Sequence, residues 1–304
     1  MTIPIHTQLS KRDPRGSQIP LPPEQMQIGK RALSQKLRDF AIRAAPSGLY
    51  GVVGRGIDFA CAIPLLGINA SIELIRSLPS KSRSQEKRQQ QLFRFKSANL
   101  QHTFCIRRGT SDAIETFYTI VRQAYGKYLP SQAPQFILDA GANIGTTSAW
   151  FLSRFPDSRV VAVEPAPSNF ALLQMNCAPF ESRVSLVQAA VWPTPANFSL
   201  RGGCDHNAIR VDESADGRCP GVTVPMLMEQ FGFPRIDFFK CDIEGAEREL
   251  FSVDSDQWLR QTRFIVVETH GSDCLDAVLE ATSRHGFTYQ RFRDLRIFAR
   301  PDSR

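Results

Sequence analysis

The chain has 304 residues, of which 42% are apolar and 22% are charged, which indicates a globular protein with room for tails rather than a disordered chain. Its cysteines are odd in number, widely spaced and without a CxxC pair, so the usual zinc and dithiol motifs are excluded. We expect all seven to be reduced thiols: Cys61, Cys105, Cys177, Cys204, Cys219, Cys241 and Cys274.

The net charge of +7 is unevenly distributed. Residues 1–100 contain 16 Lys and Arg against 6 Asp and Glu, whereas the other 204 residues contain 21 against 24. The basic character therefore belongs to the N-terminal extension, and a solubilising tail is favoured over one that binds nucleic acid or anionic lipid. No apolar stretch of signal-peptide length follows the first charges, so we expect a cytoplasmic protein. We also expect no binding to nucleic acid.

The composition predicts three segments along the chain. Residues 1–28 are rich in proline, polar and charged residues and are predicted to be disordered. Residues 29–91 are predicted to form a helical and apolar extension that ends in a linker, Lys81–Gln91. Residues 92–304 change to short apolar strands that alternate with helical patterns, and they are predicted to form the main domain.

The extension contains two segments that suit either a membrane surface or the main domain. Residues 30–45 predict a basic amphipathic helix. In the apolar stretch that follows, only residues 59–72 are free of charge, which is shorter than the roughly 20 residues of a spanning helix. Peripheral membrane contact through residues 30–78 and packing against the main domain both remain open.

The alternation in the main domain predicts a parallel sheet that is covered by helices on both faces. The first predicted strand, residues 92–106, leads to a helix that Asp112 and Glu115 would start as a capping box. Strands are then predicted at residues 136–140, 160–163, 184–191, 236–241 and 264–268, and helices at 146–154, 168–177, 225–231, from 246, and 273–284. An irregular stretch is expected at 201–221 and a hairpin around residues 293–294.

The end of the strand at 136–140 and the turn after it read LDAGANIG. The turn resembles that of nucleotide-binding folds but differs from a dinucleotide-binding turn in the ligand that it favours. Gly141 and Gly145 flank the turn and permit a ligand to approach the backbone. A dinucleotide turn would require glycines where Asn143 and Thr146 stand, and Asp139 before the turn disfavours a phosphate.

A second acid, Glu164, ends the next strand, where a carboxylate can accept hydrogen bonds from two ribose hydroxyls. The cofactor predicted from these features is S-adenosylmethionine, because an acid precedes the turn, the turn has no phosphate cradle and a second acid can bind a ribose.

Six motifs in this order resemble the FkbM family of S-adenosylmethionine-dependent methyltransferases: RRGTSD, LDAGANIG, VAVEPAPSNFALLQMN, VQAAVWP, FFKCDIEGAERE and FIVVETH. The resemblance covers residues 107–270. It implies an α/β, Rossmann-like class I methyltransferase domain with a mostly parallel seven-stranded sheet and an antiparallel C-terminal hairpin. It also implies O-methylation of hydroxyls on sugars or natural products.

The family pattern implies which residues meet the cofactor. Asp139, Gly141, Asn143 and Gly145 would surround its methionine part, and Glu164 would bind the ribose. Gln188 and Ala189 are expected near the adenine, and Asp242 is expected to face both the cofactor methyl group and the acceptor.

Asp242, Glu244, Glu268 and His270 are the candidate catalytic residues, because the carboxyl ends of parallel strands meet at one edge of the sheet. Methyl transfer to a hydroxyl is helped by a general base, and His270 is the candidate by residue type. Glu268, Asp242 or Glu244 could orient this histidine or replace it.

Two further acids, Glu247 and Glu249, are assigned to the first turn of a helix, where negative charge is favoured. The four nearby carboxylates could in principle hold Mg²⁺, but the sequence alone predicts no metal site.

Two alternatives stay open at this point. One is N- or carboxyl-methylation of a protein, lipid or metabolite with the same cofactor. The other is an inactive methyltransferase domain that binds or anchors at a membrane. The oligomeric state and the acceptor are unknown from the sequence.

Overall fold

The computed structural model describes residues 59–79, 91–127, 129–130, 132–202, 209–292 and 294–301. These residues belong to one compact unit, Asp58–Arg304. The predictions for residues 1–28, for the helix at 30–45 and for residues 81–90 of the linker lie outside the described residues.

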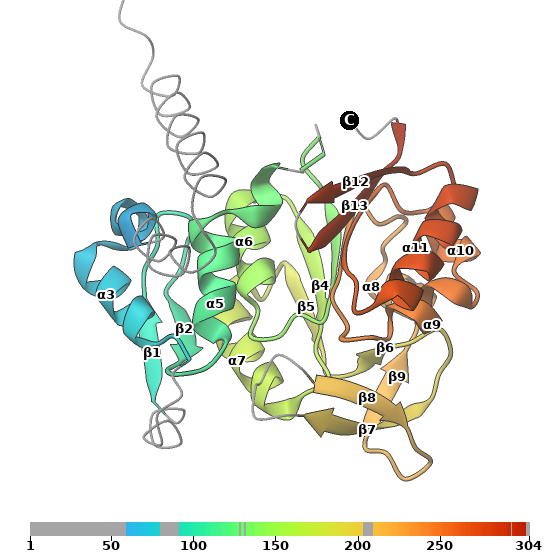
Figure 1. Ribbon diagram of the computed structural model, residues 1–304, viewed down its shortest axis with the longest axis horizontal. Helices are drawn as coiled ribbons and strands as arrows, with labels where there is room; N and C mark the ends of the chain where they lie inside the picture. Colours follow the sequence, from blue (N-terminus) through green and yellow to red (C-terminus); the bar gives the residue numbers. More distant parts are fainter. Residues whose placement is uncertain are drawn as a thin grey trace, which may run out of the picture. The chain divides into compact units, whose positions relative to one another are not determined.

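A seven-stranded sheet forms the centre of this unit, with the order β12-β13-β11-β10-β3-β4-β5 (Figure 1). Neighbouring strands from β5 to β11 run parallel, and β13 runs antiparallel to both β11 and β12. The predicted Rossmann-like sheet with its C-terminal hairpin is confirmed. The strands are β3 Phe136–Ala140, β4 Arg159–Val163, β5 Val184–Val187, β10 Phe238–Cys241, β11 Phe264–Glu268, β12 Thr288–Phe292 and β13 Leu295–Ala299.

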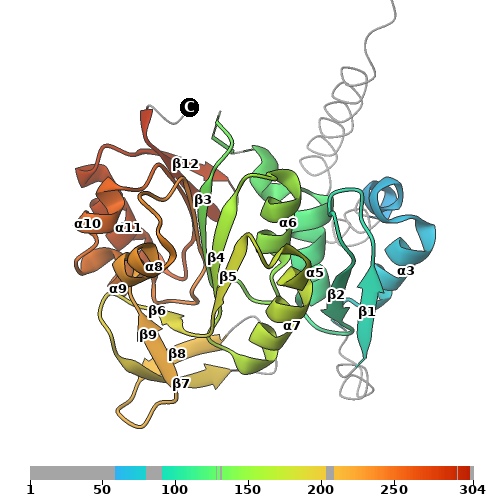
Figure 2. The same cartoon turned by 180° about the vertical axis from the view of Figure 1, so that it is seen from behind.

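Helices cover both faces of the sheet because the buried strands carry apolar side chains on each face (Figures 1 and 2). Ile137 and Val160 pack into the core under α5 Asp112–Thr116, α6 Thr146–Arg154 and α7 Pro167–Cys177. Leu138 and Val161 pack into the core on the opposite face. The helices there are α8 Val224–Phe231, α9 Glu247–Ser252, α10 Asp256–Arg260 and α11 Ser272–Arg284.

The segment before the sheet packs against the domain. Residues 59–66 are helical, and α3 spans Ile68–Arg76. Ala62 and Leu74 are fully buried in the same core as α6 and α7, and the Gly109 N–H donates to the Ser77 carbonyl at 2.9 Å. None of the helices formed by the described residues is long and apolar enough to cross a membrane.

The strand predicted at residues 92–106 is wrong in form, because a turn divides it into a hairpin. Strands β1 Leu92–Phe95 and β2 Phe104–Arg107 pair antiparallel. Phe93, Phe95 and Phe104 form the buried face of this hairpin.

The predicted capping box at Asp112 and Glu115 is also wrong. The Asp112 carboxylate accepts two hydrogen bonds from the Arg107 guanidinium and one from the Arg107 N–H, at 2.8 to 2.9 Å, so it is not available to cap α5. Helix α5 continues directly into a π-helical turn, η1 Phe117–Val121.

A small four-stranded sheet occupies the region predicted to be irregular, with the order β6-β9-β7-β8. Its strands are β6 Ala190–Val191, β7 Asn197–Gly202, β8 Ile209–Glu213 and β9 Cys219–Val222. The predicted strand at 184–191 is therefore split between the two sheets. The small sheet has its own core around the fully buried Phe198, and a Cβ at Gly221 would lie 2.6 Å from the Phe198 ring.

Candidate active site

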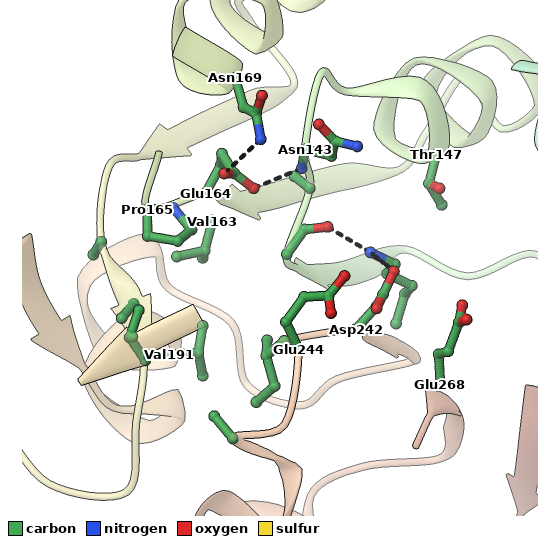
Figure 3. A pocket seen from close by; sticks show the side chains of 18 of the residues that line it. Asn143, Thr147, Val163, Glu164, Pro165, Asn169, Val191, Asp242, Glu244 and Glu268 are labelled. Carbon is green, nitrogen blue, oxygen red and sulfur yellow. Dashed lines mark hydrogen bonds and ion pairs between the residues drawn. The ribbon is translucent and has the colours of Figure 1, made fainter. Parts of the chain in front are cut away.

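A pocket opens at the carboxyl ends of β3, β4, β10 and β11, where the strand order reverses between β3 and β10. Figure 3 shows Glu164 and Asn169 on one side of this pocket and Asp242 and Glu268 on the other. Val191 from β6 and Val211 from β8 also line it, so the small sheet borders the site.

The two glycines of the turn after β3 are required for different reasons. Gly141 has a φ of 74°, and a Cβ there would lie 1.8 Å from the Asp242 carbonyl oxygen, so only glycine fits between β3 and β10. Gly145 has a φ of 84°, and a Cβ there would lie 2.8 Å from Leu173 on α7. Gly141 lines the pocket, whereas Gly145 permits close packing of α6 on α7 and does not line it.

Glu164 is held in one orientation by three hydrogen bonds. Its carboxylate accepts from the Asn143 N–H at 2.8 Å, the Ala166 N–H at 3.0 Å and the Asn169 side-chain amide at 3.2 Å. Its burial is the largest influence on the pKa of this carboxyl and raises it above its usual value. The predicted ribose-binding acid is therefore preorganised at the end of β4.

Asn169 in turn is oriented by the buried ion pair of Arg107 and Asp112. The Arg107 guanidinium donates to the Asn169 side-chain oxygen at 2.9 Å, which directs the amide nitrogen of Asn169 toward Glu164. The RRGTSD motif thus supports the β4 acid from the hairpin β1–β2. Sequence reasoning missed this role because it assigned Asp112 to a helix cap.

The turn presents polar atoms that have no hydrogen-bond partner among the described residues. They are the side-chain oxygens of Asn143 and Thr146, which both line the pocket. A buried polar atom without a partner is costly, so these atoms fit a ligand that donates hydrogen bonds.

Of the remaining residues predicted to bind the cofactor, one lines the pocket and two do not. Ala189 is buried and lines the pocket, whereas Gln188 is exposed and does not line it. Asp139 is fully buried behind the turn, where it accepts a hydrogen bond from the Ser148 hydroxyl at 2.6 Å. Asp139 therefore supports the turn from behind.

Lys240 is a buried cation that sequence reasoning missed. Its ammonium donates to the Gly141 carbonyl at 2.5 Å and lies 3.4 Å from Asp139 and 3.5 Å from Asp242. Burial alone would lower the pKa of Lys240, but these two carboxylates raise it well above its usual value, so the side chain is charged. A lysine in an otherwise apolar strand, FFKC, was the available signal.

Three carboxylates and one imidazole lie close together near the turn that follows β10. His270 Nε2 lies 3.4 Å from a Glu244 oxygen and 4.0 Å from an Asp242 oxygen, and its Nδ1 lies 3.0 Å from the fully buried Glu247. Hydrogen bonding to Glu247 is the main cause that raises the pKa of His270 to about 9. A histidine with this pKa holds its proton at neutral pH, so it suits a proton donor better than the general base.

Two further carboxyl groups in the pocket have raised pKa values. Burial, followed by the nearby Asp242, raises the pKa of Glu115 and of Glu268 to about 7 in each case. Glu115 lines the pocket from α5 and was assigned only to the capping box by sequence reasoning. Among the pocket-lining residues that the structure describes, five carboxylates face one basic side chain, Lys240.

The description "Methyltransferase FkbM domain" belongs to the family model that matches residues 139–299, which is more than half of the chain. The chain belongs to the FkbM methyltransferase family. It is therefore a methyltransferase, and the sequence-based assignment is confirmed at this level.

Two curated relatives and one solved structure are among the proteins that the chain is similar to. It is 31% identical to "Methyltransferase sdnD" of Sordaria araneosa, over 46% of this chain and 68% of that one. It is 26% identical to "AMB antimetabolite synthetase AmbE" of Pseudomonas aeruginosa, over 57% of this chain but only 10% of that one. The solved "Methyltransferase FkbM" from Methylobacillus flagellatus is 16% identical, with a TM-score of 0.41, and the match covers 57% of this chain and 45% of that one.

Proposed function

We propose that the protein transfers a methyl group from S-adenosylmethionine to a hydroxyl oxygen of a sugar, glycan or natural product. The observation that carries the choice of cofactor is the excess of carboxylates in the pocket, five against one lysine. S-adenosylmethionine has a net positive charge, and an acidic pocket attracts it while it repels phosphate-bearing cofactors.

The residues present fit this cofactor. Glu164 is oriented by three hydrogen bonds and would accept from the two ribose hydroxyls. The unpartnered oxygens of Asn143 and Thr146 would accept hydrogen bonds from the ammonium of the methionine part. Ala189 would border the adenine, where its small side chain leaves room for a ring.

The opposite side of the pocket supports methylation of oxygen. An alcohol is a weak nucleophile until its proton is removed, and a base whose pKa lies near 7 suits this task. We assign this role to Glu115, which lines the pocket and whose pKa is raised to about 7, mainly by burial. Glu268 lines the same side and would accept a hydrogen bond from a second hydroxyl of the acceptor.

In this assignment the acceptor proton passes to the Glu115 carboxylate while the acceptor oxygen bonds to the methyl carbon. A bound S-adenosylmethionine would supply the activated methyl group, and the electron pair of the broken carbon–sulfur bond would stay on its sulfur. The protein contributes alignment and exclusion of water, which is mainly proximity catalysis. The Lys240 ammonium lies 3.5 Å from the Asp242 carboxylate and helps to hold it in place.

The acceptor class is supported by the acidic lining and by one relative. Carboxylates bind neutral polyols through hydrogen bonds, whereas an anionic acceptor would be repelled. The relative from Pseudomonas aeruginosa is named an antimetabolite synthetase, and the match spans 10% of its length. An N-methylated acceptor is the competing class, and it would need no base if its amine is already neutral.

Two measurements test the proposal. Calorimetry of the full chain should detect S-adenosylmethionine and S-adenosylhomocysteine but not NAD⁺. Cofactor with a labelled methyl group is then incubated with fractionated glycan, lipid and metabolite pools, and the labelled product is treated with acid and base to distinguish ethers from esters and methylamines. Binding of NAD⁺ in place of S-adenosylmethionine would refute the cofactor, and a labelled methylamine would refute the oxygen acceptor.

A further inference from the structure

Three side chains at and beside the acceptor side of the pocket have potential metal-ligand atoms close together. These atoms belong to Asp242, Glu244 and His270, and all three lie within 4.8 Å of one another. Metal–ligand distances of about 2.1 Å place neighbouring ligand atoms about 3 Å apart in an octahedron and opposite ones about 4.2 Å apart. The distances from His270 Nε2 to Glu244, 3.4 Å, and to Asp242, 4.0 Å, fall in this range.

The histidine is held in the orientation that a metal ligand needs. Its Nδ1 hydrogen-bonds to Glu247 at 3.0 Å, and Glu247 is fully buried. The Glu247 oxygen also lies within hydrogen-bonding distance of the N–H groups of Ile243 and Gly245, at 3.2 and 3.3 Å. A buried carboxylate holds the proton on Nδ1, as in carboxylate–histidine–metal arrangements, and a bound cation would take the place of the second imidazolium proton on Nε2.

The two oxygens of Asp242 face different groups. One lies 3.5 Å from the Lys240 ammonium, and the other lies 4.0 Å from His270 Nε2. Lys240 therefore neutralises one oxygen and leaves the other beside His270 and Glu244. Asp242 and Glu244 also line the pocket, so a cation between them would be accessible to an acceptor.

We propose that Asp242, Glu244 and His270 bind one divalent cation of the Mn²⁺ and Mg²⁺ class, with Glu247 as a positioning residue. Two carboxylates and one imidazole suit such a cation, and three protein ligands leave coordination positions for water or an acceptor oxygen. This inference reverses the sequence-based expectation of no metal site. That expectation counted nearby acids but contained no information on where the His270 nitrogens point.

The role of the cation rests on the proposed function, whereas its binding does not. A cation at this position would bind the acceptor hydroxyl and stabilise the negative charge that develops on oxygen during methyl transfer. Glu115 is not one of the three ligands and remains available to take the proton. An acceptor with a second oxygen beside the methylated one would bind the cation through both oxygens, so vicinal diols form the expected substrate class.

Mn²⁺ is the probe for the site, because its electron paramagnetic resonance signal decreases on binding. The full-length chain is titrated with Mn²⁺, and the variants Asp242→Asn, His270→Gln and Glu247→Gln are compared with Asp273→Asn. Asp273 is an exposed acid on the first turn of α11, close to His270 in sequence, and serves as the matched control. S-adenosylmethionine calorimetry on the same samples reports folding and the cofactor site.

We expect one Mn²⁺ per chain, displaced by Mg²⁺, with affinity at least tenfold weaker in the three site variants and unchanged in Asp273→Asn. A loss of about 10- to 100-fold in Glu247→Gln with unchanged cofactor affinity identifies a positioning role. No binding of Mn²⁺ to a sample that binds the cofactor overturns the metal site alone. Equal Mn²⁺ affinity in wild type and His270→Gln also overturns it. Mn²⁺ binding without cofactor binding refutes the proposed function and leaves the metal site standing.

Discussion

Replacement of Glu164 by alanine should weaken S-adenosylmethionine binding by about a hundredfold. The carboxylate is fixed by the N–H groups of Asn143 and Ala166 and by the Asn169 amide. No reorganisation is then needed when ribose hydroxyls replace water on its remaining lone pairs. Two charge-assisted hydrogen bonds at roughly 1.5 kcal/mol each amount to about 3 kcal/mol, which corresponds to about a hundredfold in the dissociation constant.

The assay is isothermal calorimetry with S-adenosylmethionine on wild type, Glu164→Ala and the control Glu181→Ala. Glu181 is an exposed acid that precedes β5, at the opposite edge of the sheet from the pocket. The control removes the same charge from the protein, so it separates a local contact from a general loss of negative charge. A Glu164→Ala protein that is folded and binds the cofactor as tightly as Glu181→Ala would refute the ribose assignment.

Three further predictions concern the supports of the pocket. The Glu115→Gln variant should become more stable than the wild type as the pH rises, because the folded wild-type protein disfavours the ionised form of the Glu115 carboxyl. Folding raises the pKa of Glu115 from 4.5 to about 7, so the wild type loses up to about 3 kcal/mol of folding free energy as the pH rises between these values. Urea unfolding at pH 5 and pH 8 should therefore show a difference between variant and wild type that is larger at pH 8. Arg107→Ala should lower the free energy of unfolding by about 3–5 kcal/mol because it leaves Asp112 buried without its partner, and an unchanged urea midpoint would contradict this. Gly141→Ala should abolish cofactor binding and lower the melting temperature, since its Cβ would lie 1.8 Å from the Asp242 carbonyl oxygen, and a normal thermal scan with normal binding would disprove the close approach.

The central sheet could be predicted from the sequence because its signals are local. Strands β3 and β11 are short apolar runs between turn residues, and both were predicted with their observed bounds. Helix α6 was also predicted with its observed bounds, and Gly145 and Phe155 flank it in the structure. The topology then follows from the alternation of strands and helices.

The small sheet was missed, and the capping box predicted for α5 was wrong, because both depend on tertiary contacts. Strand β9, CPGV, contains glycine and proline, which disfavour a strand in sequence terms, yet its Gly221 packs closely against the Phe198 ring. Asp112 at the start of a helix is indistinguishable in sequence from a cap, but Arg107 competes for its carboxylate. Local patterns do not reveal which distant group a side chain meets.

The candidate site was predicted in part for the same reason. Glu164 and Asp242 directly follow strands and Glu268 ends one, so the rule on strand ends placed them in one pocket, where the structure also has them. Glu115 comes from a helix outside the alternating part of the chain, and Lys240 lies within a strand rather than at its end. Both line the pocket, but their positions depend on packing rather than on strand ends.

The dependence of Glu164 on Arg107 sets a lower limit on the size of a working fragment. The family model begins at residue 139, yet the side chains that brace and complete the pocket begin 32 residues earlier, with Arg107, and include Glu115. Expression boundaries drawn at the family match would remove the hairpin and α5 and leave Asn169 without its guanidinium partner. A transplantable module should therefore start upstream of β1, and chimaeras between relatives should exchange that hairpin together with α7.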